Sequence, residues 1–150
     1  YNRHKLHQVF ASEINRSDRF EEIFGIILLD IDLFKNVNDT YGHNIGDLVL
    51  KEMSHILKDN IRVSDTLGRW GGEEFLIVIP QTDIEGARIL AEKLRKEIEN
   101  HHFSTVGKLT ASFGVACYRK GDDENSIVKR ADEALYKAKA LGRNIVVIKE

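Results

Sequence analysis

The stretch Arg69-Trp70-Gly71-Gly72-Glu73-Glu74-Phe75-Leu76-Ile77-Val78-Ile79-Pro80 decides the fold. Its Gly-Gly pair stands between two strand-like segments, because Thr66 and Leu67 precede it and an apolar run ending at Pro80 follows it. Glycine reaches the positive φ angles of tight hairpin turns at little steric cost, and proline cannot donate to a strand ladder. The pattern therefore predicts a β-hairpin with two acidic residues at its tip. Taken alone, it favours an ordinary solvated tip over a metal-binding turn.

The composition allows one domain and excludes several classes of partner. The chain has 150 residues, of which 42% are hydrophobic and 31% charged, enough for a single core. A net charge of −2 excludes a strongly basic surface, so we expect no nucleic acid as partner. No apolar stretch approaches the roughly 20 residues of a membrane helix, so we expect no membrane contact by this domain. The single cysteine, Cys117, excludes an internal disulfide and fits a cytoplasmic location.

Hydrophobic periodicity predicts the remaining elements. Apolar residues at helical spacing indicate helices near residues 6–14, 34–41, 45–57, 84–98 and 127–138. Short apolar runs indicate strands near residues 24–29, 66–70, 75–79, 109–118 and 145–148. After the first helix the order is βααββαβαβ, which predicts an α/β (more narrowly α+β) fold with a single mixed, mainly antiparallel sheet flanked by helices.

Asp30-Ile31-Asp32 closes the strand predicted at residues 24–29 and allows two interpretations. It is either a solvated strand end with helix-capping carboxylates or a site for a hard cation. Because strand side chains alternate, Asp30 and Asp32 share a face, and both could not be buried without a counter-charge. If the hairpin pairs beside this strand, Glu73 approaches Asp30. Two carboxylates and a carbonyl would then leave positions open for water and phosphate oxygens around Mg²⁺.

Three blocks of the sequence resemble GGDEF-domain diguanylate cyclases. The first is DIDLFKNVNDTYGHNIGD at 30–47, the second is the GGEEF form of the family's name-giving motif at 71–75, and the third is RADEALYKAKALGRN at 130–144. They stand in the family's order and span essentially the whole chain. The resemblance implies an adenylate-cyclase-like or ferredoxin-like sheet, with residues 1–150 forming the catalytic domain. Tyr1-Asn2-Arg3 resembles the end of the family's Leu-Thr-Gly-Leu-x-Asn-Arg motif, so we expect the C-terminal part of a longer sensor protein, with the parent's membrane anchoring left open.

The resemblance also implies an activity. Two GTP molecules would be condensed to cyclic di-GMP with release of two pyrophosphates, because the 3′-hydroxyl of each GTP attacks the α-phosphate of the other. Each domain binds one GTP, so a homodimer is implied for catalysis. Cyclic di-GMP is expected to act both as product and as inhibitor.

Carried over position by position, the resemblance assigns a metal site and catalytic groups. Asp30, the carbonyl of Ile31, Glu73 and Glu74 would hold Mg²⁺, with Mn²⁺ as a substitute ion. Glu73 or Glu74 would help to remove the 3′ proton, and the resemblance does not decide between them. Lys35 would stabilise charge at the phosphates, although without its flanking motif a solvated surface lysine is the better interpretation.

The implied substrate pocket includes a pair of guanine-reading residues. Asn38 and Asp47 match them, since a carboxylate accepts from guanine N1 and N2 and an amide meets O6 or N3. As alternatives, either residue could be a helix cap, and His43 a helix-terminal histidine. Lys139 and Arg143, four residues apart, would reach the terminal phosphates together, or else complement a helix dipole. The other expected substrate contacts are Phe34, Lys35, His43, Gly71 and Gly72.

A second ligand site is indicated by Arg62-Val63-Ser64-Asp65, which matches the family's RxxD inhibitory motif nine residues before Gly71. Arg62 would donate to guanine O6 and N7, and Asp65 would accept from N1 and N2. An ordinary exposed ion pair is the alternative.

Three hypotheses about function follow from the sequence. The first is an active GTP-condensing enzyme, and the second is a non-catalytic receptor for GTP or cyclic di-GMP. The third, a purely structural dimerisation module, is disfavoured by the many polar residues at one end of the predicted sheet. Because the Gly-Gly turn and its acids are intact, the sequence favours the enzyme.

Overall fold

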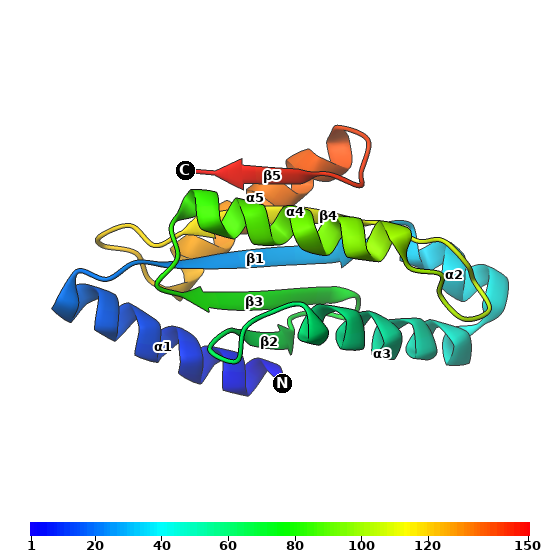
Figure 1. Cartoon of the computed structure of the whole chain (residues 1–150), viewed down its shortest axis with the longest axis horizontal. Helices are drawn as coiled ribbons and strands as arrows, with labels where there is room; N and C mark the ends of the chain where they lie inside the picture. Colours follow the sequence, from blue (N-terminus) through cyan, green and yellow to red (C-terminus); the bar gives the residue numbers. More distant parts are fainter.

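A five-stranded sheet with the strand order β2-β3-β1-β4-β5 runs through the computed structural model, which describes all 150 residues (Figure 1). Neighbouring strands are antiparallel except for the pair β4 and β5, which is parallel. The predicted mixed, mainly antiparallel sheet is therefore confirmed. The strands are β1 Phe24–Ile31, β2 Thr66–Arg69, β3 Glu74–Pro80, β4 Ala111–Cys117 and β5 Val146–Lys149.

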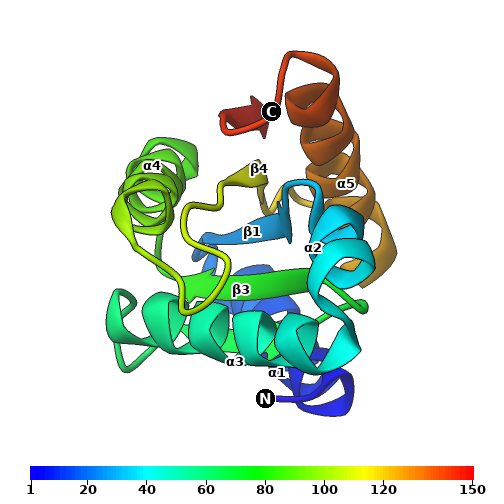
Figure 2. The ribbon, with the colours of Figure 1, turned by 90° about the vertical axis from the view of Figure 1, so that its right-hand side faces the viewer.

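Five helices cover the sheet, and α4 and α5 lie on opposite sides of it (Figure 2). Their order along the chain agrees with the sequence pattern, although the helix expected from Ile45 already begins at His43, directly after Gly42. No helix combines the length and the apolar character that a membrane span requires. The helices are α1 Arg3–Phe20, α2 Phe34–Tyr41, α3 His43–Asp59, α4 Ile84–Asn100 and α5 Glu124–Ala140.

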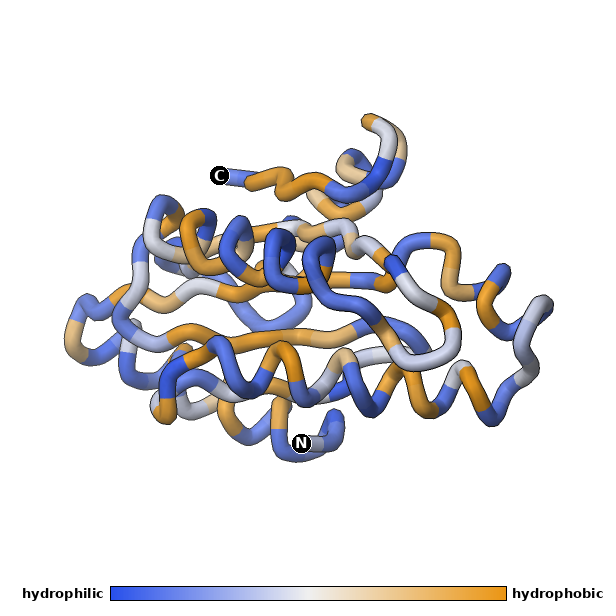
Figure 3. The backbone as a smooth tube through the Cα atoms, turned by 45° about the vertical axis from the view of Figure 1, so that its right-hand side comes forward, coloured by the Kyte–Doolittle hydropathy of each residue, from blue (hydrophilic) through white to orange (hydrophobic).

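The core consists of two apolar layers, one on each face of the sheet. Ile27 and Leu29 of β1 face the layer that α2, α3 and α4 complete, whereas Ile26 and Leu28 face the layer that α1 and α5 complete. All eight residues of β1 are buried, because helices cover both of its faces. Figure 3 shows the resulting hydrophobic stretches along the central strands. Each fully buried Leu or Ile contributes about 1.5–3 kcal/mol, so this double layer is the main stabilising feature of the sheet.

The hairpin between β2 and β3 forms as predicted, but the conformational reason given for its glycines is wrong. Neither Gly71 nor Gly72 adopts a positive φ. The turn is closed instead by the backbone N–H groups of Trp70 and Gly71, which donate to the carbonyl of Glu74 at 2.9 and 3.4 Å. A Cβ atom at position 71 would lie 2.6 Å from Oε1 of Glu74. In this conformation the Glu74 carboxylate occupies the space beside Gly71, so a larger residue at position 71 would displace that carboxylate.

Candidate active site

Antiparallel pairing of β1 with β3 brings the acids of two distant motifs together. Asp30 stands opposite Glu74 in the register, and the carboxyl groups of Asp30 and Glu73 are within hydrogen-bonding reach. Asp30 is 4% exposed, and its Oδ2 accepts from Nζ of Lys139 on α5. Its Oδ1 is buried without any hydrogen-bond partner. An unpartnered carboxylate oxygen at this depth is costly unless a donor or a cation meets it.

The electrostatics of this acidic centre favour a bound cation. Burial raises the pKa of Asp30, although the ammonium group of Lys139 opposes that effect. Burial also raises the pKa of Glu73, and the negative charge of Asp30 adds to it. The pKa of Glu74 is raised by burial and then by the charges of Asp30 and Asp132. Lys139 acts as counter-charge to all three crowded carboxyl groups and Arg3 to Glu74 alone, and a bound cation would relieve the remaining repulsion.

The residues present fit a divalent metal ion in an open site. The orphaned Oδ1 of Asp30 and the adjacent carboxylate of Glu73 are hard oxygen donors of the kind that such ions prefer, and the carbonyl of Ile31 lies next in the chain. No three His, Cys, Asp or Glu side chains form a ready-made metal cage. This agrees with a site in which two carboxylates and a carbonyl share the ion with water and phosphate oxygens.

Asp32, the second acid of the Asp-Ile-Asp segment, has a structural role instead. It is buried together with Asp30, and the counter-charge expected for the two acids is Lys139, which contacts Asp30 and not Asp32. Thr110 Oγ1 and Ser112 Oγ donate to its carboxylate at 2.7 and 2.6 Å, and the backbone N–H of Asn144 donates at 3.0 Å. Three neutral donors satisfy the charge, so Asp32 anchors β4 and the loop after α5 to the end of β1.

The expected guanine-reading residues lie on two consecutive helices. Asn38 is half-buried on α2, and Asp47 is exposed on α3. Gly46 brings the two helices close, because a Cβ atom at that position would lie 1.9 Å from Oδ1 of Asn38. The helix-cap alternative is wrong for both residues, since the N-cap positions belong to Leu33 and Gly42. The polar groups of Asn38 and Asp47 are thus not used by helix termini.

Other expected substrate contacts surround this helix pair and the acidic centre. Lys35 is exposed on α2, and His43 is exposed at the first position of α3. Phe34 differs from the expectation, because its side chain is 6% exposed and belongs to the core, which leaves only its backbone to meet a ligand. Gly71 and Gly72 remain in the turn beside Glu74, where no side chains of their own obstruct access.

Lys139 and Arg143 were expected to reach one side of a helix together, and that geometric argument is wrong. Helix α5 ends at Ala140, so only Lys139 is helical. Gly142 and Arg143 adopt positive φ angles of 115° and 67°. Arg143 therefore projects from a loop, where i and i+4 spacing does not apply, and its side chain is exposed.

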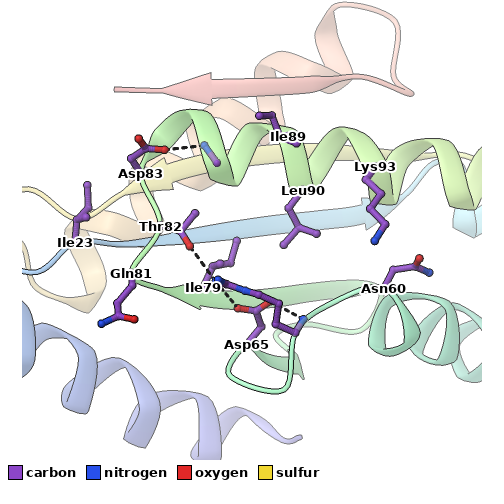
Figure 4. A pocket seen from close by; sticks show the side chains of 12 residues that line it. Ile23, Asn60, Asp65, Ile79, Gln81, Thr82, Asp83, Ile89, Leu90 and Lys93 are labelled. Atoms are coloured by element: carbon purple, nitrogen blue, oxygen red, sulfur yellow. Dashed lines mark hydrogen bonds and ion pairs between the residues drawn. The ribbon is translucent and has the colours of Figure 1, made fainter.

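The Arg62–Asp65 pair borders a hollow of about 620 Å³ at the other end of β3 (Figure 4). The Asp65 side chain is fully buried, and its carboxylate accepts from the backbone N–H of Arg62 at 2.8 Å and from Nη2 at 3.1 Å. Nη2 also donates to Thr82 Oγ1 at 3.0 Å and to the carbonyl of Pro80 at 3.1 Å. Asp65 thus holds Arg62 in place. The two residues form an ion pair in which the aspartate is buried and the arginine exposed, and binding of a ligand here stays a prediction. Lys93 of α4 lines the opposite wall.

Comparison with known proteins bears directly on this geometry. The family model described as diguanylate cyclase, GGDEF domain, matches residues 1–145. The chain belongs to the GGDEF family. Diguanylate cyclase A of Treponema denticola is 44% identical to this GGDEF domain over 139 residues, which cover 90% of the chain and 38% of the relative. The response regulator PleD of Caulobacter vibrioides is 39% identical, with 98% of the chain and 34% of the relative covered. The chain therefore spans little more than a third of the length of these curated relatives.

Solved structures share the fold of this GGDEF domain. The active GGEEF domain of a diguanylate cyclase from Vibrio cholerae is 38% identical, with a TM-score of 0.94, and 99% of this chain and 97% of that chain are covered. The GGDEF domain of DgcB from Caulobacter crescentus, solved in complex with c-di-GMP, is 29% identical with a TM-score of 0.93, covering 98% and 90% of the two chains.

Several residues of the GGDEF domain's candidate sites carried no signal in the sequence that we could read. Thr82 holds Arg62 from 20 residues away, and Lys93 comes from an otherwise ordinary amphipathic helix. Asn144 was included only as the last letter of the third motif, yet its backbone binds Asp32 across 112 residues. Only the tertiary arrangement brings these partners together.

Proposed function

We propose that this GGDEF domain condenses two GTP molecules into cyclic di-GMP and two pyrophosphates. The observation that carries the proposal is the acidic centre, where Asp30, with an unpartnered buried Oδ1, and the carboxyl group of Glu73 come together at the meeting point of the two signature motifs. Asp30, Glu73 and the Ile31 carbonyl would hold Mg²⁺, with Mn²⁺ as a substitute and Glu74 at its edge. Bound there, the ion would neutralise phosphate charge and acidify the attacking 3′-hydroxyl.

Around that centre the chain's own residues would bind the triphosphate and move the proton. Glu74 would accept the 3′ proton, and its pKa, raised chiefly by burial, makes it a stronger base than an ordinary glutamate. Glu73 adjoins it and is the alternative base. Lys35, Lys139 and Arg143 would stabilise the charge that grows on the leaving pyrophosphate.

Base recognition would fall to Asn38 and Asp47. Their side chains belong to adjacent helices that Gly46 brings close. Asp47, being exposed, is free to accept hydrogen bonds from N1 and N2 of guanine, donors that adenine does not present in the same pattern. His43, Gly71, Gly72 and the backbone of Phe34 would line the rest of the substrate pocket.

Catalysis would require a homodimer. Each domain has one acidic centre and one guanine-reading pair, so a single copy holds one GTP and lacks the attacking hydroxyl of the second. Two copies facing each other would supply both reactants in alignment, which is where most of the rate gain from proximity arises. Since GTP is an intracellular nucleotide, we place the domain in the cytoplasm.

The hollow beside Arg62 would bind the product and give feedback inhibition. Arg62 is 57% exposed at the side chain and is fixed by the buried Asp65. Its Nε and Nη2 already donate to Asp65, Pro80 and Thr82, so bidentate donation to O6 and N7 of guanine would use Nη1 and would require Nη2 to release Pro80 and Thr82. Asp65 would act mainly by holding Arg62, because its carboxylate is already occupied in this conformation.

Replacement of Arg62 tests the inhibitory site. We expect Arg62→Ala to raise the cyclic di-GMP concentration for half-inhibition at least 10-fold, the loss of one good bidentate contact. Turnover of product-free protein should be unchanged, because strand rise separates this hollow from Glu74 by roughly 20 Å. Initial rates at increasing product concentration provide the measurement. Full inhibition of the variant at the wild-type concentration would exclude this site.

The activity itself is tested by incubating the chain, fused to a constitutive coiled-coil dimer, with GTP and Mg²⁺ and resolving the nucleotides by chromatography. We expect cyclic di-GMP and pyrophosphate in a ratio of one to two, and none when the metal is chelated. Absence of product, together with calorimetric binding of cyclic di-GMP that depends on Arg62, would favour the receptor alternative and refute the enzymatic proposal.

A further inference from the structure

The loop that follows α5 has an unusual backbone. Gly142, Arg143 and Asn144 adopt consecutive positive φ angles of 115°, 67° and 49°. One such residue is enough to end a helix, and Gly142 can fill that position without strain. Each further L-residue in this region costs about 1–2 kcal/mol. The conformation of residues 143 and 144 therefore persists only because surrounding contacts hold it.

Those contacts converge on Asn144. Its backbone N–H donates to Asp32 at 3.0 Å, its Oδ1 accepts from Nη1 of Arg95 at 3.1 Å, and its Nδ2 donates to Glu99 at 2.5 Å. Asp32 is itself fixed by two hydroxyl groups of β4 and its approach. Arg95 is held by Glu92 at 2.6 Å. Asn144 is thus bound to the end of β1 and to α4 by groups that are themselves fixed.

Arg143 contrasts with its neighbour. Its backbone N–H donates to the carbonyl of Ala138 at 3.1 Å, while its guanidinium group is exposed. Lys139, on the last turn of α5, already reaches the acidic centre, where its Nζ contacts the carboxylate of Asp30. The exposed arginine and the anchored asparagine are thus adjacent in a strained loop.

We propose that Asn144 is a positioning residue that holds Arg143 in the orientation needed to bind the terminal phosphates of the substrate. This inference rests on the proposed function, in which Arg143 contacts those phosphates. A guanidinium group binds phosphate through parallel donors, and that geometry is effective only when the backbone beneath it is fixed beforehand. If the two side-chain hydrogen bonds of Asn144 are removed, the loop is free to relax and the arginine loses its alignment.

The test uses Asn144→Gly, because glycine keeps the positive φ without strain and removes only the side-chain contacts. Calorimetry with Mg²⁺ would compare the unreactive α,β-methylene analogue of GTP with GMP, which lacks the terminal phosphates. We expect affinity for the triphosphate analogue to fall about 10-fold, as in Arg143→Ala, and affinity for GMP to be unchanged. The double variant should bind no more weakly than either single variant, because the two residues act as a unit.

Asn100→Gly is the matched control, since Asn100 is an exposed asparagine at the end of α4 whose side chain makes no hydrogen bond. It should bind both nucleotides like the wild type. Glu99→Ala, which removes one partner of Asn144 at a partly exposed position, should produce a smaller loss in the same direction.

Equal losses of affinity for GMP and for the analogue in folded Asn144→Gly would overturn the proposal, as would an unchanged affinity for the analogue. Wild-type binding by Arg143→Ala would refute the premise that Arg143 meets the phosphates, and the inference with it. Because binding of the analogue needs no turnover, these results are independent of whether the wild-type protein forms cyclic di-GMP.

Discussion

At the scale of single residues, Glu73 shows how the acidic centre exchanges stability for binding. Its pKa is raised by burial and by the neighbouring charge of Asp30. The ionised form of Glu73 therefore destabilises the metal-free protein. A divalent cation that binds here meets carboxylates whose mutual repulsion it relieves. The repulsion lowers the unfolding free energy of the metal-free protein, and its relief adds to the binding free energy of the cation.

Glu73→Gln separates these two effects. Removing one charge from the cluster should raise the melting temperature of the metal-free protein at neutral pH, and should abolish the further rise that Mg²⁺ gives the wild type. Turnover of GTP should fall by about 10²–10⁴-fold, the usual effect of losing a group that acts in the transition state. Thermal scans with and without Mg²⁺, alongside product assays, check both. Wild-type turnover in a folded variant would refute the catalytic assignment.

Sequence reasoning at this scale brought Asp30 and Glu73 together, because strand ends and a hairpin can be read from apolar runs. It assigned Asp30 and not Asp32 to the metal site, but it gave Asp32 no role of its own. Thr110 and Ser112 bind Asp32 from 78 and 80 residues away. No local pattern announces such partners, since hydroxyl donors are common and their use depends on strand register.

At the scale of elements, the contact between β4 and α5 determines where Lys139 stands. A Cβ atom at Gly114 of β4 would lie 2.1 Å from the carbonyl oxygen of Ala131 and 2.5 Å from the backbone nitrogen of Leu135. Backbone atoms of the helix are thus pressed directly against the strand. This close approach allows the end of α5 to reach Asp30 on the neighbouring strand.

Gly114→Ala should therefore destabilise the domain, because the methyl group forces α5 away from the sheet. We expect a loss of about 1–3 kcal/mol, the typical cost of overpacking a core. Urea unfolding followed by circular dichroism should show a lower midpoint with an unchanged slope. Gly72→Ala is the control, since a Cβ atom there meets nothing within 4 Å. Equal stability of both variants would contradict the packing described for α5.

Helix α1 carries a buried acid that makes stability depend on pH. Glu13 is 7% exposed, and burial, opposed by Arg16 and supported by Glu22, raises its pKa above the ordinary 4.5. A pKa raised by folding gives stability that is fully present below the unfolded pKa and is lost as the pH rises through the folded pKa. Neutral Glu13 is thus the form that the fold prefers.

Glu13→Gln should remove that dependence. The unfolding free energy of the wild type, relative to the variant, should fall as the pH rises from about 4.5 towards 7. Urea titrations of both proteins across this range provide the measurement, with the exposed Glu97→Gln as control. If the unfolding free energy of the wild type relative to the variant stays constant or grows with pH, folding does not raise the pKa of Glu13.

Element boundaries were largely predictable, and the exceptions have physical reasons. The helix at 34–41 was placed correctly because Gly42 ends it at a φ of 88°. The next helix was expected two residues late, since His43 and Asn44 carry no apolar signal. The sequence predicted that the last helix stops at Gly142, and it ends at Ala140. The mistake was to apply helical spacing to Lys139 and Arg143 across that stop.

At the scale of the whole molecule, β3 connects two sites that differ in character. Its first residue, Glu74, belongs to the acidic centre, and its last, Pro80, accepts a hydrogen bond from Arg62 at the second hollow. The arrangement separates the proposed chemistry from the proposed product site by the length of one strand. The overall fold was predictable because hydrophobic period and element order alone restrict the sheet to few topologies.

The most direct test of the central claim, that two copies of this domain each present one GTP to the other, is the specific activity of the unfused chain over a wide range of protein concentration. The account predicts that specific activity rises in proportion to concentration while the chain is monomeric by light scattering, and that the coiled-coil dimer shows a constant, higher value. A monomeric chain with the same specific activity at every concentration would contradict it, because one domain would then complete the condensation alone.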